Sequence, residues 1–76
     1  MNHPPITQKT LRERLAKKVR TQRNKLGLTL KVVSERAEMH WRHWQKIEAA
    51  EVNVTLQTLV RIGDALSIDP ADLICA

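Results

Sequence analysis

The sequence predicts an all-α fold, a compact domain of five helices around one small core. The first observation is length, because a chain of 76 residues forms one domain that buries about 60% of the surface of its unfolded chain. The second is periodicity, since apolar residues recur at the spacing of helices, with no alternating strand pattern and no internal repeat. The third is that each helical segment follows a residue that favours a helix start.

Residues 1–9 are expected to form a flexible arm ahead of a single domain over residues 10–76. Two early prolines oppose a helix in the arm. Thr10 and the glutamate three residues later form a capping-box pattern. Apolar residues then repeat at helical spacing until Gly27, which favours a C-terminal cap. The first helix is therefore predicted over residues 11–26.

Two short helical patterns follow, separated by a tight turn. Thr29 is a good N-cap for a second helix over residues 30–37. A third helix is predicted over residues 40–49, with Trp44 directed into the core by its place in the apolar spacing. Together these segments predict a helix-turn-helix over about residues 29–49.

Two further helices are expected in the C-terminal part. Thr55 is a good N-cap, and a broad apolar stripe follows it at helical spacing through Leu66. Gly63 lies inside this stripe and costs about 1 kcal/mol relative to Ala. It indicates close approach of another backbone, the alternative being an uncompensated glycine. Asp69 as N-cap and Pro70 at the first helical position then predict a last short helix.

Charge is distributed unevenly along the chain. The net charge is +5 and the isoelectric point is near 10.0. Residues 1–26 hold eight basic side chains and one acidic side chain, hence +7, which leaves −2 for the rest. A basic surface of this kind favours an anionic partner. On a helical wheel, one stripe either follows a phosphate backbone or is a solvated face, and it consists of Arg14, Lys17, Lys18, Thr21 and Lys25.

Several classes of protein are disfavoured. Cys75 is the only cysteine and is expected to be a free thiol, the alternative being an intermolecular disulfide. No segment reaches the roughly 18 to 20 apolar residues of a membrane span, and no secretory signal is present, so a cytoplasmic protein without membrane association is expected. Motifs for phosphate loops, nucleophile elbows and paired catalytic carboxylates are missing, which predicts no enzyme activity and no cofactor. His40 and His43 lack the further ligands of a zinc site, so no metal is expected.

Several short segments, taken in order, resemble the lambda-repressor-like, or XRE-type, helix-turn-helix family. The resemblance covers roughly residues 15–74 and rests on Arg23, GLT at 27–29, Ser34, IE at 47–48, Asn53, TLQTL at 55–59 and DAL at 64–66. It implies a homodimeric transcriptional regulator of repressor or controller type that binds a palindromic operator in double-stranded DNA, with the third helix in the major groove. It also implies an ion pair between Arg23 and Glu48 that ties the first helix to the recognition helix.

The outward face of the predicted third helix is polar, and long polar side chains there reach base edges in the major groove. The candidate base-reading residues are Trp41, Arg42, Gln45 and Lys46. Arg42 is the strongest candidate, because its planar fork bonds guanine O6 and N7 together, and Gln45 offers the equivalent pair for adenine. The candidate phosphate contacts are Thr29, His40, His43, Asn53, Lys17 and Lys18. For the two histidines, exposed polar surface is the alternative.

The sequence departs from the family pattern at the predicted DNA surface. Leu30 stands where family members usually carry a phosphate-binding Gln, and Trp41 occupies a base-reading position. This apolar pair either packs on a thymine methyl or joins Val32 in a dock for a protein partner. The dock would make the chain a protein-interaction module of the same fold, with weak or lost DNA binding. Glu51 and Val52 also occupy a loop that is usually basic.

Dimerisation is expected through the C-terminal part of the chain. That part offers more apolar surface than so short a last helix can cover alone. The residues expected in the dimer interface are Leu66, Ile68, Leu73 and Ile74.

Overall fold

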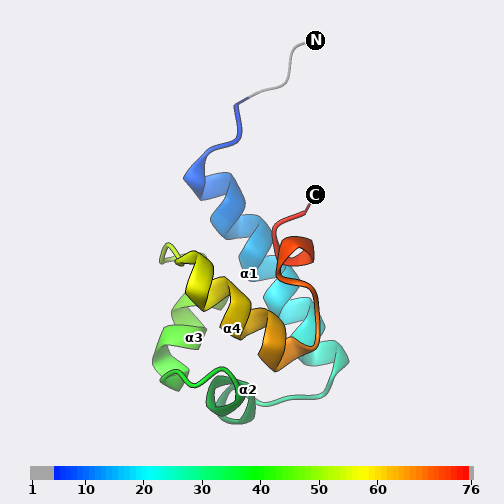
Figure 1. The fold of residues 1–76 in the computed structure, drawn as a ribbon. Helices are drawn as coiled ribbons and strands as arrows, with labels where there is room; N and C mark the ends of the chain where they lie inside the picture. Colours follow the sequence, from blue (N-terminus) through cyan, green and yellow to red (C-terminus); the bar gives the residue numbers. More distant parts are fainter. Residues whose placement is uncertain (1–4, 76) are drawn as a thin grey trace.

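The computed structural model describes residues 5–75, and in that range all regular structure is helical (Figure 1). Positions 1–4 of the expected arm and Ala76 lie outside the described residues. The elements are α1 (Gln8–Lys25), α2 (Leu30–Arg36), α3 (Trp41–Glu48), α4 (Leu56–Leu66) and a 3-10 helix, η1 (Pro70–Leu73). The all-α prediction is confirmed, whereas the count of five α-helices is wrong by one.

The last element winds as a 3-10 helix because it is a single turn. Asp69 caps it as predicted, with its carboxylate accepting from the Ala71 amide at 2.9 Å. The Asp72 amide donates to the Asp69 carbonyl at 2.9 Å, which is the three-residue hydrogen bond of a 3-10 turn. A segment of four residues closes such a turn more readily than a full α-helical turn.

Helix α1 begins earlier than predicted. Thr7, not Thr10, is the N-cap, and its hydroxyl oxygen accepts from the Thr10 amide at 3.2 Å. Gln8 and Lys9, which were expected in the arm, are therefore helical. Thr7 and Thr10 each have a hydroxyl oxygen that can cap a helix. A start at Thr7 also allows a hydrogen bond from the Leu11 amide to the Thr7 carbonyl.

The core is formed by one apolar face from each helix, and Trp44 at its centre has no exposed surface, as predicted. Leu66 and Leu73 are also fully buried, so they cannot form the dimer interface expected from the sequence. Their burial follows from the path of η1, which folds back against both α4 and α1. The core cluster comprises Leu15, Val19, Val33, Ala37, Trp44, Ile47, Leu59, Ile62, Ala65, Leu66 and Leu73.

At Gly63, the C-terminal segment lies in close contact with α4. A Cβ atom at this position would lie 2.7 Å from the Ile68 carbonyl oxygen and 2.9 Å from Pro70 Cγ. The Ile68 amide also donates to the Gly63 carbonyl at 3.0 Å, after Ser67 turns the chain with a φ of 53°. The prediction of a close backbone approach at Gly63 is therefore confirmed.

We expect Gly63→Ala to lower the free energy of unfolding by about 1 to 2 kcal/mol. Forcing a methyl group into this contact costs about 1 to 3 kcal/mol, and the better helix propensity of Ala returns up to about 1 kcal/mol. Urea unfolding followed by far-ultraviolet circular dichroism measures the difference. The control is Gln57→Ala, at an exposed position of the same helix. Equal or higher stability of Gly63→Ala than of the wild type would contradict the close contact.

Candidate DNA-binding surface

Helix α3 has one buried face and one solvent-facing polar face. Trp44 and Ile47 are directed into the core, with at most 1% of their surface exposed. The four candidate base-reading residues and His43 are all exposed: Trp41, Arg42, His43, Gln45 and Lys46. His40 is the N-cap, and its Nδ1 atom accepts from the Arg42 amide at 3.1 Å. The helix therefore begins with a satisfied amide and presents its long polar side chains outward.

A network centred on Glu48 joins α3 to α1. Arg23 Nε donates to Glu48 Oε2 at 2.6 Å, and Arg23 Nη2 donates to Glu48 Oε1 at 2.9 Å. Trp44 Nε1 donates to the same Oε2 at 2.6 Å. Arg23 Nη1 donates to the Leu28 carbonyl at 3.0 Å, which connects the turn between α1 and α2 to the same network. Because bidentate charged hydrogen bonds have strict geometry, this network sets the orientation of α3.

Arg23 remains charged within this network. Its hydrogen bond to Glu48 raises the pKa of the guanidinium above its ordinary value, partial burial opposes the increase, and the charge of Glu48 adds to it. A raised pKa in the folded state stabilises the fold at every pH below the ordinary titration range of arginine, and the stabilisation is lost only as the pH rises through the raised value. The arginine side of the pair is therefore intact throughout the neutral range.

The turn between α2 and α3 sets the angle between these two helices. Glu38 adopts a φ of 56°, and the Met39 amide donates to the Ser34 carbonyl at 3.0 Å. Ser34 is 2% exposed, which requires a small side chain there. At the other end of α2, the Thr29 hydroxyl accepts from the Val32 amide at 3.2 Å, so Thr29 is the predicted cap. The N-terminus of α2 and the outer face of α3 are exposed together.

Leu30 and Trp41 share a hollow of about 530 Å³ between α2 and the start of α3. The Trp41 ring stacks on His40 with centroids 5.6 Å apart, and the Arg42 guanidinium carbon lies 5.4 Å from the Trp41 ring centroid. Val32 does not line this hollow. It lies two residues after Leu30, which rotates it by about 200° around the helix. The three residues therefore do not form the single apolar dock that was considered from the sequence.

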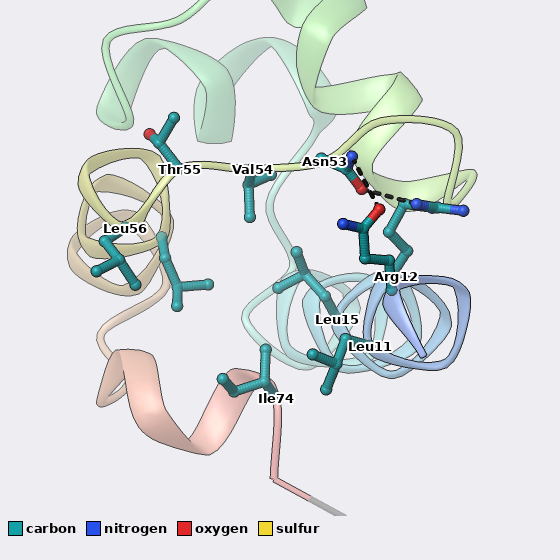
Figure 2. Close-up of a pocket in the computed structure, with 10 residues that line it drawn as sticks. Leu11, Arg12, Leu15, Asn53, Val54, Thr55, Leu56 and Ile74 are labelled. Atoms are coloured by element: carbon teal, nitrogen blue, oxygen red, sulfur yellow. Dashed lines mark hydrogen bonds between the residues drawn. The ribbon is translucent and has the colours of Figure 1, made fainter. Parts of the chain in front are cut away.

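Asn53, in the loop after α3, is held by α1. Its Oδ1 atom accepts from Arg12 Nη1 at 2.7 Å, and its Nδ2 atom donates to Gln8 Oε1 at 3.5 Å (Figure 2). The sequence reasoning did not identify Arg12. The spacing contains a usable signal, because Arg12 and Arg23 are eleven residues apart, about three helical turns, and so share one face of α1. Arg12 brings a positive charge to a loop that lacks basic residues of its own.

Lys17 and Lys18 lie on a different face of α1. They line a groove with Ile68 and Cys75 from the C-terminal segment. Relative to Arg23, which faces α3, they are rotated around the helix by about 120° to 140°. Figure 1 shows α3 and η1 on different sides of α1. The structure thus brings Arg12 and Arg23 toward the helix-turn-helix, but it does not bring Lys17 and Lys18 there.

Within residues 5–75, no group of three or more histidine, cysteine, aspartate or glutamate side chains is arranged to hold a metal ion. Over the same range, no helix has the length and apolar character needed to cross a membrane.

We expect Glu48→Ala to reduce the free energy of unfolding by about 3 kcal/mol, because it removes the acceptor of Arg23 Nε and Nη2 and of the Trp44 N–H. Trp44→Phe keeps most of the buried volume and should cost less, mainly through the lost N–H bond. Chemical denaturation measures both. Glu51→Ala, at an exposed glutamate of the following loop, is the control. A Glu48→Ala protein as stable as that control would show that the network does not hold α3.

Three solved structures share this fold. The restriction-modification controller protein C.AhdI from Aeromonas hydrophila has a TM-score of 0.78 and 21% identity, with 82% of this chain and 94% of that chain covered. An HTH_3 family transcriptional regulator from Vibrio cholerae has a TM-score of 0.83 and 21% identity over 88% of this chain, which spans only 38% of that protein. The clp gene regulator ClgR from C. glutamicum has a TM-score of 0.77 and 25% identity, with 93% and 86% covered. No curated protein sequence matches this chain.

A family model described as a helix-turn-helix domain matches residues 10–73. The matched range contains α2, the turn and α3, together with the Arg23 and Glu48 pair that orients them. The chain therefore belongs to the helix-turn-helix domain family, and its predicted resemblance to lambda-repressor-like domains is confirmed.

Proposed function

We propose that this chain is a sequence-specific DNA-binding transcriptional regulator that binds a palindromic operator as a homodimer. The observation that carries the proposal is the exposed polar face of α3, which is held at a fixed angle by the Arg23, Glu48 and Trp44 network. An α-helix fits the major groove of B-DNA, where each base pair presents a distinct set of donors and acceptors. Helix α3 is then the recognition helix.

Base reading is assigned to the outward side chains of α3. Arg42 donates from a planar fork that matches guanine O6 and N7, and Gln45 matches adenine N6 and N7. Arg42 also lies against the Trp41 ring, which limits the positions that the guanidinium samples. Lys46 extends from the same exposed face and serves a guanine or a phosphate. The hollow beside Trp41 and Leu30 has the apolar character to accept a thymine methyl group.

Phosphate contacts are assigned around the edge of this surface. Thr29 and His40 stand at the N-termini of α2 and α3, where amide dipoles favour an anion. His43 is exposed in the first turn of α3, and Asn53 lies in the loop that follows the helix. Arg12 supplies the cation at Asn53. Lys17 and Lys18 are not part of the proposed surface, because they face the C-terminal groove.

The homodimer is assigned to an apolar patch that keeps only Ile74 from the interface predicted by the sequence. We define the apolar patch as Leu11, Leu56, Val60 and Ile74. Leu56 is 82% exposed, and Val60, one turn later on α4, is 49% exposed. Leu11, Leu56 and Ile74 surround one pocket of about 300 Å³ (Figure 2). An exposed patch of this kind favours a second copy related by a two-fold axis.

The alternative function is that of a protein-interaction module. In that case a protein partner would bind in the hollow beside Leu30 and Trp41, which Val32 does not line. This alternative predicts an intact fold with little affinity for DNA at any salt concentration. Measuring DNA binding at several salt concentrations separates the two functions, because phosphate contacts make the affinity fall steeply as salt rises.

We expect Arg42→Ala to weaken binding to a duplex selected by the wild-type protein by about 5- to 150-fold, equivalent to about 1 to 3 kcal/mol. The preference at one base position should relax at the same time. Fluorescence anisotropy on a panel of single-base variants measures both effects. Arg61→Ala removes an exposed arginine of α4 that makes no salt bridge within residues 5–75 and serves as the matched control. If the two variants bound the duplex with equal affinity, Arg42 would not be a base-reading residue.

For the dimer, we expect the wild-type chain to have twice the monomer mass at micromolar concentrations and Leu56→Glu to shift it to monomer. A carboxylate at the centre of an apolar interface raises the dissociation constant by about 100-fold or more. Light scattering after size exclusion gives the mass, and circular dichroism verifies the fold. Leu26→Glu, which alters an exposed leucine outside the patch, should leave the dimer intact. A monomeric wild type would contradict the dimer, and a dimeric Leu56→Glu would contradict this interface.

A further inference from the structure

We propose that the groove between α1 and the C-terminal segment is a docking site for an acidic segment of a protein partner. This groove has a volume of about 630 Å³. We call it the basic groove and define it by its lining residues, which are Arg14, Lys17, Lys18, Thr21, Gln22, Ile68 and Cys75. This inference goes beyond the proposed DNA-binding function and concerns a different face of the molecule.

The basic groove carries three positive charges, and none of its lining residues is acidic. The charges are those of Arg14, Lys17 and Lys18. The only salt bridge among residues 5–75 joins Arg23 to Glu48, so these three cations make none with any described residue. An acidic ligand would supply the missing opposite charge.

The charge of the basic groove is not used by the DNA surface. Lys17 and Lys18 are rotated well away from the face of α1 that holds Arg23 and Arg12, as their sequence spacing requires. Contacts of α1 with η1 define the groove side, and contacts of α1 with α3 define the DNA side. A duplex lying on α3 therefore leaves the basic groove free for a second ligand.

The chemistry of the walls favours a protein segment over nucleic acid. Ile68 and the aliphatic parts of the basic side chains give the groove an apolar component, which a sugar-phosphate backbone does not match. Arg14 and Lys18 are one turn apart on α1, about 6 Å along its axis. Carboxylates at i and i+4 of a partner helix have nearly the same separation, with room for an apolar side chain against Ile68. The fitting ligand therefore has paired carboxylates and an adjacent apolar residue.

The test uses the single cysteine as a native reporter, since Cys75 is exposed and lines the groove. The probe is a synthetic helical peptide with Glu at i and i+4 and Leu between them, compared with the same peptide carrying Gln for Glu. We expect the Glu peptide to slow alkylation of Cys75 severalfold and the Gln peptide to leave the rate unchanged. Lys17→Glu should weaken peptide binding by about tenfold.

Matched controls separate this site from the DNA surface. Arg61→Glu makes the same change of charge on α4 and should preserve binding of the Glu peptide, and Lys17→Gln should give an intermediate loss without charge reversal. Affinity for a DNA duplex should be the same in Lys17→Glu and Arg61→Glu. If α3 does not bind DNA, the peptide result still stands, so the two proposals fail separately.

Four outcomes would overturn the proposal. One is an unchanged alkylation rate with the Glu peptide, and another is equal protection by the Gln peptide. A third is protection of Cys75 by duplex DNA together with loss of DNA affinity in Lys17→Glu, which would make the groove a nucleic-acid site. The fourth is a change in solution mass in Lys17→Glu, which would make it an interface between copies.

Discussion

The hydrogen-bonded network of Arg23, Glu48 and Trp44 holds α3 in its orientation against α1. Helix α3 has only eight residues, too few to be stable alone, so its direction is set by what it packs against. Glu48 accepts from α1 and from the buried indole of α3 at the same time. The same arginine also reaches the Leu28 carbonyl at the entrance to α2. One ion pair thus links α3 with α1 and with the turn before α2.

The sequence predicted the helices well where their start signals were unique. Thr29, Thr55 and Asp69 are each the cap expected from the pattern, and Gly63 lies at the predicted close approach. It failed where two residues offered the same chemistry, as Thr7 and Thr10 do at the start of α1. The spacing of apolar residues also does not show where the short segment η1 packs against the other helices. The burial of Leu66 and Leu73 is a tertiary property, and the sequence pattern therefore placed two core residues in the expected dimer interface.

For the candidate site, the outward face of α3 followed from helical periodicity, because the same spacing that buries Trp44 exposes Arg42 and Gln45. The basic stripe of α1 was recognised as a stripe, but its orientation depends on the packing of η1 against α1. Spacing places Arg12 on the same face of α1 as Arg23, but its hydrogen bond to Asn53 depends on the packing of the loop after α3 against the start of α1. Helix α1 thus presents positive charges on two different faces, one toward α3 and one toward η1. The net charge of the chain does not show on which face each basic residue lies.

We propose that α3, oriented by Glu48, is the surface that meets DNA. Nuclear magnetic resonance of the isotopically labelled protein, titrated with a duplex selected by it, locates the contacted residues. We expect backbone amide shifts to concentrate at the start of α2, along α3 and in the loop around Asn53, while Lys17, Lys18 and Cys75 remain unshifted. Shifts concentrated along the basic groove, with α3 unaffected, would contradict it.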